Sequence, residues 1–153
     1  MKEILRTLLR RAGYEMVNIR NPSGASAFPT DFSAEDVRTY MRVRAFTQTS
    51  QERVHAMIRA VEYVVAHSVP GALAECGVWK GGSMMAAALT LLALGCRDRT
   101  LHLLDTYEGM TRPTPEDEPR AHERWHRDRR EDGNDWNRVP MEEVRQNLRS
   151  TGY

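Results

Sequence analysis

Residues 73–85, LAECGVWKGGSMM, carry the strongest structural signal in this chain. An apolar run ends at an acid, Glu75, three glycines follow within six residues, and a helical pattern begins at Ser83. Glycine lets the backbone bend sharply and approach a ligand closely. In an open parallel sheet, ligands bind beyond the carboxyl ends of the strands, at a turn of this kind. The stretch therefore predicts a strand, a binding turn and a helix.

The neighbouring segments extend this pattern into a crossover. Residues 72–76 are short and apolar, residues 82–95 have a long apolar helical pattern, and residues 100–105, TLHLLD, are again strand-like. A helix of this length can connect two parallel strands by a right-handed crossover. We therefore expect an α/β, Rossmann-like fold.

Two helices are expected before the crossover. Ser33 and Asp36 have the spacing of a capping box, in which each side chain binds a free amide at the helix start, for a helix through about residue 46. Thr49 and Glu52 have the same spacing for a second helix. These helices would pack over the cofactor or form a dimer face.

The remaining segments set the expected organisation of the chain. Residues 1–32 predict a short helix followed by a linker rich in Pro, Ser and Gly, and residues 33–153 predict one domain. Within that domain, residues 111–135 are dominated by proline and charge, which predicts a mobile lid or a disordered loop. Residues 140–152 predict a final helix.

Composition excludes several classes of protein. The chain has 153 residues, of which 41% are apolar, and this is enough for one domain with a core. Its 22 Lys and Arg nearly balance its 21 Asp and Glu, so no overall charge favours nucleic acid. No segment approaches the roughly twenty apolar residues of a membrane span, and the N-terminus lacks the apolar core of a signal peptide. Cys76 and Cys96 lie in apolar segments and predict buried free thiols of a reducing, cytoplasmic compartment.

The turn and the second strand together predict a nucleoside-bearing cofactor. The first amides of the helix, near Gly82 and Ser83, would face the site, and Asp105 would accept both hydroxyls of a ribose. The dinucleotide pattern G-x-G-x-x-G would place Trp79 where pyrophosphate needs a bare backbone, which argues against NAD. The spacing E-x-G-x-x-x-G is that of S-adenosylmethionine methyltransferases. A glycine turn that serves packing alone remains an alternative.

The segments around the turn resemble a known family. They are ECGVWKGGSMMAAALTLLALG, LLDTYEGM and PTPEDE, with TQTSQERVHAMIRAVEYVV before them and VPMEEVRQNLRSTGY after them. These segments are similar to those of the macrocin O-methyltransferase (TylF-like) enzymes. The resemblance covers roughly residues 40–153. It implies an S-adenosylmethionine-dependent O-methyltransferase that acts on a hydroxyl group of a small molecule, such as a sugar of a macrolide-like natural product.

The resemblance also implies site residues and a metal. The cofactor-binding residues would be Glu75, Gly77, Gly81, Gly82, Ser83 and Asp105. The family implies Mg²⁺, but its carboxylate ligands and most of the acceptor pocket would lie beyond Tyr153. No residue is assigned as catalytic or as a metal ligand. We expect the fold to be truncated after its second strand–helix unit, and this makes activity of the isolated chain doubtful.

Several alternatives remain open. His122, Glu123 and His126 have the H-E-x-x-H spacing of a zinc site, although a solvated charged segment explains them better. Trp125 and Trp136 would either close over an acceptor or pack the loop onto the domain. The whole chain could be a catalytically silent nucleoside-binding or interaction module, or an NAD-dependent oxidoreductase. A small-molecule acceptor is the expected partner, and a homo-oligomer is left open.

Overall fold

The computed structural model describes residues 28–131 and 133–153. The chain divides into two compact units, residues 1–33 and residues 34–153. The second unit contains the helices and strands described below. The short helix expected near the N-terminus lies outside the described residues.

A two-stranded parallel sheet lies along one side of the helices of the second unit. Strand β1, Leu73–Cys76, pairs with β2, Leu101–Leu104, in the register Leu73↔Leu101 to Cys76↔Leu104. Gly77 continues the pairing, because its amide donates to the Leu104 carbonyl over 2.9 Å. The predicted strands and their parallel crossover are confirmed.

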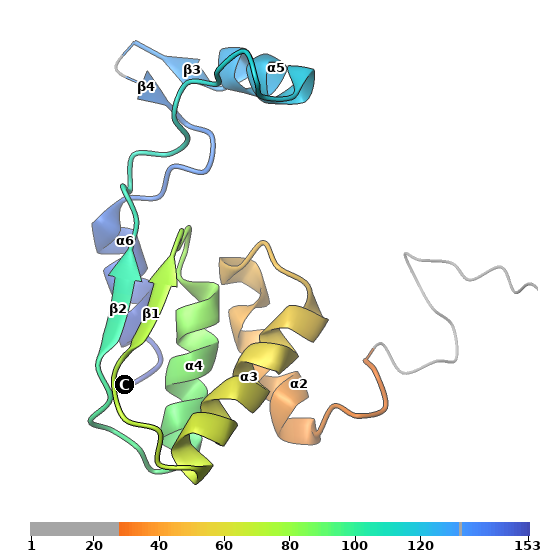
Figure 1. Ribbon diagram of the computed structural model, residues 1–153, viewed down its shortest axis with the longest axis vertical. Coiled ribbons are helices and arrows are strands. Elements are labelled where there is room, and N and C mark those ends of the chain that lie inside the picture. Colours follow the sequence, from red (N-terminus) through yellow and green to blue (C-terminus); the bar gives the residue numbers. More distant parts are fainter. Residues whose placement is uncertain (1–27, 132) are drawn as a thin grey trace, which may run out of the picture. The chain divides into compact units, whose positions relative to one another are not determined.

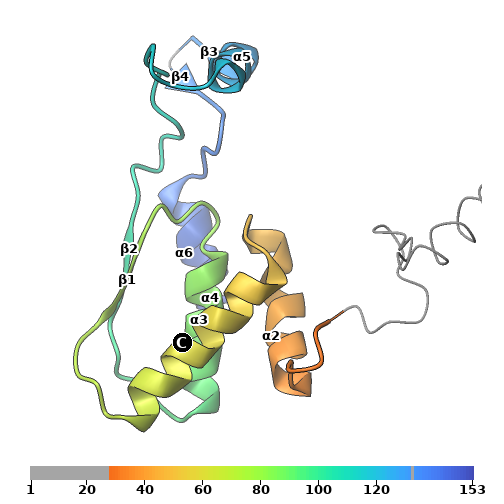
Figure 2. The same ribbon diagram turned by 45° about the vertical axis from the view of Figure 1, so that its right-hand side comes forward.

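Helix α4, Gly82–Ala93, forms the crossover and is buried almost all round. It packs against the sheet on one side and against α2, Ala34–Val43, and α3, Gln51–Ala66, on the other. Figures 1 and 2 show these helices on one face of the sheet. A helix enclosed in this way must be apolar on every side, which explains its run of Met, Ala and Leu.

A buried charge joins α2 to α3. Asp36 is only 1% exposed, and its Oδ1 accepts from Arg59 Nη2 over 2.5 Å, while His55 Nε2 lies 3.7 Å from Oδ2. A buried carboxylate is tolerated only when it is paired in this way.

The start of α3 differs from the prediction. Its N-cap residue is Ser50, and no side chain caps the helix, so the predicted capping box at Thr49 is wrong.

No described residue covers the other face of the sheet. Alternate side chains of the two strands point away from the helices, and Leu104 among them is 55% exposed. Cys76 lies on this face and is exposed, while Cys96 is half-buried. Both cysteines are free, but the prediction that they are buried is wrong, because no second layer covers this side.

The proline-rich segment contains secondary structure that its sequence did not indicate. A helix, α5, spans Pro119–Arg127, and two short antiparallel strands follow, β3 at Arg129–Arg130 and β4 at Gly133–Asn134. The prediction of a loop without structure is therefore wrong. No residue of α5 is buried, so its sequence shows no apolar face.

Polar contacts hold this segment together instead of a core. Asn134 Nδ2 donates to the Trp125 carbonyl over 2.6 Å, and Asn134 Oδ1 accepts from the Trp136 amide over 2.8 Å.

The last helix, α6, spans Met141–Arg149 and confirms the prediction for that region. No described helix is both long and apolar enough to cross a membrane.

Replacing Gly82 by alanine should destabilise the domain. A Cβ at this position would come within 2.6 Å of the backbone of Phe46 and of Thr47 Cβ, so α4 would have to move. We expect a loss of about 1–3 kcal/mol in the free energy of unfolding, measured by urea denaturation, despite the better helix propensity of alanine. The control is Gly152→Asn, where φ is +83° and a Cβ has nothing within 4 Å. A stabilised Gly82→Ala protein would contradict this close packing.

Candidate functional site

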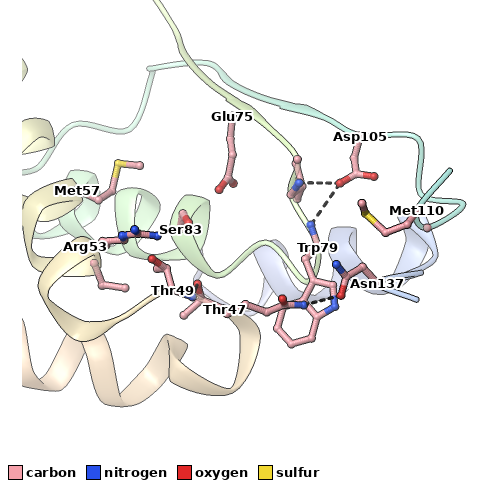
Figure 3. Close-up of a pocket in the computed structure, with 15 residues that line it drawn as sticks. Thr47, Thr49, Arg53, Met57, Glu75, Trp79, Ser83, Asp105, Met110 and Asn137 are labelled. Atoms are coloured by element: carbon pink, nitrogen blue, oxygen red, sulfur yellow. Dashed lines mark hydrogen bonds between the residues drawn. The ribbon is translucent and has the colours of Figure 1, made fainter. Parts of the chain in front are cut away.

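A cavity of about 520 Å³ lies at the carboxyl ends of β1 and β2. Figure 3 shows its side chains, which come from α3 and the segment before it, from the end of β1, from the start of α4 and from the loop after β2. This volume lies within the range of small-molecule and cofactor sites. The cavity is at the position that the glycine-rich turn predicts.

Asp105 fixes the turn after β1. Its Oδ2 accepts from the amides of Val78 over 2.6 Å and Trp79 over 3.3 Å, and its Oδ1 accepts from the Tyr107 amide over 2.9 Å. The register brings these groups together, since Cys76 and Leu104 are partners at the strand ends. Burial opposes ionisation of Asp105, but the amides of Tyr107, Val78, Trp79 and Thr106 together lower the pKa of its carboxyl group.

These bonds occupy part of the acceptor capacity of Asp105. A carboxylate has about four acceptor positions, and the amides of Val78, Trp79 and Tyr107 already donate to its two oxygens. A ribose bound here would share these oxygens with the amides. The expected contact with both ribose hydroxyls stays a prediction.

Glu75 enters the same cavity with one of its carboxylate oxygens unsatisfied. It alternates with Leu73 on β1, so its side chain points to the helix-covered face, toward Ser83 (Figure 3). Its Oε2 is buried and has no hydrogen-bond partner among the described residues. Burial raises the pKa of Glu75, the charge of Asp105 raises it further, and the Ser83 hydroxyl opposes this shift. A cation placed here would relieve the cost of burying the carboxylate.

The three glycines have different roles. Gly77 lines the cavity, has φ of +81°, and a Cβ there would meet nothing within 4 Å. Gly81 and Gly82 do not line the cavity. A Cβ on Gly81 would come within 2.8 Å of Leu148 Cδ2, and Gly82 approaches Phe46 as described above. These two glycines make room for neighbouring protein, and their predicted contact with a cofactor stays a prediction.

Trp79 forms one end of the cavity. Its φ is +48°, and its indole extends toward the side of Thr47 and Asn137 (Figure 3). Gln48 Nε2 donates to Asn137 Oδ1 over 2.9 Å and closes that end. The turn amides of Val78 and Trp79 bind Asp105, so they are not available as a pyrophosphate cradle.

Helix α3 contributes Arg53, Val54 and Met57 to the cavity lining, and none of them was identified as a site residue from the sequence. The buried residues Val54, Ile58 and Val61 mark the inner face of α3. Positions 53 and 57 flank that face on a helix. The apolar pattern of α3 therefore indicates which positions border its buried face. Only the packing of α3 against α4 shows that positions 53 and 57 reach the cavity.

A second cavity, of about 470 Å³, adjoins the first, because Gly109 and Met110 line both. Trp125 lines the second cavity, and its Nε1 is buried without a partner among the described residues. Trp136 does not line it and packs instead under Arg124, whose guanidinium carbon lies 5.0 Å from the ring centre.

The H-E-x-x-H residues lie on α5. His122 Nε2 is 2.9 Å from the Thr114 carbonyl oxygen and is used in a loop contact. Across residues 28–131 and 133–153, no group of three or more His, Cys, Asp or Glu is arranged to hold a metal ion.

The fold is of the α/β methyltransferase type. The O-methyltransferase NovP superposes on the chain with a TM-score of 0.56 and 26% identity, over 97% of this chain and 57% of that one. The chain belongs to the macrocin-O-methyltransferase (TylF) family, whose model matches residues 5–153. The family expected from the sequence is confirmed.

Curated relatives are natural-product O-methyltransferases. Mycinamicin III 3''-O-methyltransferase of Micromonospora griseorubida is 34% identical over 57% of this chain and 33% of its own. The 8-demethyl-8-(2,3-dimethoxy-alpha-L-rhamnosyl)-tetracenomycin-C 4'-O-methyltransferase of Streptomyces olivaceus is 35% identical over 71% of this chain and 40% of its own. The matched part of this chain thus spans well under half the length of either relative.

Replacing Glu75 by glutamine should stabilise the ligand-free protein. Because the pKa of Glu75 is raised on folding, its ionised form costs stability above that pKa. We expect Glu75→Gln to raise the free energy of unfolding at pH 7 by about 0.5–1 kcal/mol, allowing for solvent screening of this half-buried group. The gain should vanish below about pH 4, where the carboxyl is protonated in both states.

Urea denaturation at both pH values measures this difference, with the exposed Glu123→Gln as the control. A Glu75→Gln protein that is less stable than the original at pH 7 would show that the carboxylate already has a favourable partner.

Replacing Asp105 by asparagine should have the opposite effect. The lowered pKa means that ionised Asp105 stabilises the fold above the ordinary pKa of about 3.9, and that this contribution is lost as the pH falls through the folded-state pKa. We expect Asp105→Asn to cost about 1 kcal/mol at neutral pH and less in acid. Thermal denaturation at pH 7 and pH 3 tests this, with Asp98→Asn for comparison. An equal loss at both pH values would exclude the charge as the cause.

Proposed function

We propose that residues 34–153 form the S-adenosylmethionine-binding part of an O-methyltransferase that acts on a hydroxyl group of a small molecule, on the sugar of a natural product. The observation that carries this proposal is the pair of carboxylates in one cavity. Glu75 Oε2 lacks a hydrogen-bond partner among the described residues, and Asp105 lines the same cavity, at the strand ends where cofactors bind in open parallel sheets. Membership of the TylF family supplies the reaction class.

The donor set suits each part of this cofactor. S-adenosylmethionine supplies an activated methyl group on a positively charged sulfur when it is bound. Glu75 would accept the ammonium of its amino-acid end, which is the cation that this buried carboxylate lacks. Asp105 would accept the ribose hydroxyls, and Gly77 leaves the backbone open beside it. The adenosyl group would then lie between Glu75 and Trp79.

The second cavity is the proposed approach for the acceptor. It shares Gly109 and Met110 with the first, so a hydroxyl there could reach the methyl group in line. Trp125 would give it an aromatic wall, which suits the apolar face of a sugar. Holding donor and acceptor in line is the main contribution that these residues would make to the rate.

Magnesium is not part of this proposal for the described residues. The family resemblance implies it, but no described cluster offers a suitable set of ligands. The cytoplasm is the proposed location, because free cysteines, one of them exposed, are typical of a reducing compartment.

Calorimetric titration of the 153-residue chain tests the cofactor. We expect S-adenosylhomocysteine to bind and NAD to bind at least about tenfold more weakly, since the turn amides that would hold a pyrophosphate are bonded to Asp105. Tight binding of NAD alone would contradict the proposal. Binding of S-adenosylhomocysteine without methyl transfer to any acceptor would instead support a silent nucleoside-binding module.

A further inference from the structure

Arg53 is a positive charge that lines the cavity and has no partner among the described residues. It lies in the first turn of α3, Gln51–Ala66, and lines the cavity beside Val54 and Met57. No hydrogen bond or ion pair of its side chain occurs within the part of the chain that the structure describes. Arg59, two turns further along the same helix, is by contrast bonded to Asp36 and Glu62.

Arg53 and Glu75 approach the cavity from opposite sides. Figure 3 shows the guanidinium of Arg53 and the carboxylate of Glu75 with Ser83 between them. No ion pair joins the two, although both line the same cavity and carry opposite charges. The site therefore presents one cation and one anion that are held apart, each short of a counter-charge.

We propose that Arg53 binds the α-carboxylate of S-adenosylmethionine, so that Arg53 and Glu75 together recognise the zwitterionic amino-acid end of the cofactor. This inference rests on the proposed function. An α-amino acid carries an ammonium and a carboxylate on one carbon, which matches a carboxylate and a guanidinium on opposite sides of one cavity. Arginine suits this role because its planar group can bind both oxygens of a carboxylate.

The pairing also explains the selection of the cofactor. Adenosine alone, or a dinucleotide, has no amino-acid group to satisfy Glu75 and Arg53, and would leave both charges without partners. A site with polar groups strongly rejects a ligand that leaves those groups unpaired. This discrimination is larger than the one that results from a missing apolar contact. Arg53 is thus a determinant of specificity that α3 contributes from outside the strand–turn–helix motif.

The test compares two ligands that differ only in the carboxylate, S-adenosylmethionine and decarboxylated S-adenosylmethionine, by calorimetry on the 153-residue chain. The unmodified chain should bind the first at least about tenfold more tightly. Arg53→Gln should weaken S-adenosylmethionine by about tenfold or more and leave the decarboxylated ligand within about twofold, or bound more tightly. Glu75→Gln should weaken both ligands, because both carry the ammonium.

The control is Arg44→Gln, which removes an exposed charge of the short helix η1, Arg44–Phe46, outside the cavity, and should change neither affinity. Arg53→Lys keeps the charge but loses the planar group that can bind both carboxylate oxygens. Its affinity for S-adenosylmethionine should fall between those of the original chain and Arg53→Gln. If Arg53→Gln fails to fold, the comparison of the two ligands on the unmodified chain and on Arg53→Lys still decides the matter.

Each other outcome has one meaning. Equal affinity of the unmodified chain for the two ligands, or an equal loss for both in Arg53→Gln, would overturn the role of Arg53 while leaving the proposed function intact. Failure of both ligands to bind the unmodified chain would overturn the proposed function and this inference together.

Discussion

The geometry of this domain depends on the hydrogen bonds between the Asp105 carboxylate, after β2, and the backbone amides of the turn after β1. The bonds from the Val78 and Trp79 amides to Asp105 tie the carboxyl ends of β1 and β2 together. With the turn held there, α4 must begin at Gly82, close against residues 46 and 47, and Glu75 must face the helices rather than solvent. The cavity is the space that these constraints leave.

The two acids of the cavity have opposite relations to stability. Asp105 is ionised and accepts from several backbone amides, and it stabilises the fold, whereas half-buried Glu75 has one oxygen without a partner among the described residues and costs stability. A group that destabilises the ligand-free protein and lies in a cavity is typical of a binding residue. The contrast therefore separates a carboxylate that mainly builds the site from one that the site holds ready for a ligand.

The sequence predicted the strands, the crossover and the position of the site, because a glycine-rich turn between apolar segments has few other structural solutions. It could not separate Gly77, which lines the cavity, from Gly81 and Gly82, which leave space for protein, since only tertiary packing distinguishes them. Helix α5 was missed because contacts of Asn134 replace an apolar face. Arg53 was missed because its relation to Glu75, 22 positions away, depends on how α3 packs against α4.

The most direct test of this account is a crystal structure of the chain with S-adenosylhomocysteine. The account predicts the ribose beside Asp105, the bonds from Val78 and Trp79 to Asp105 intact, and the amino-acid end between Glu75 and Arg53. A ligand that lies in the opposite direction, or outside this cavity, or that binds only after the turn amides leave Asp105, would contradict it.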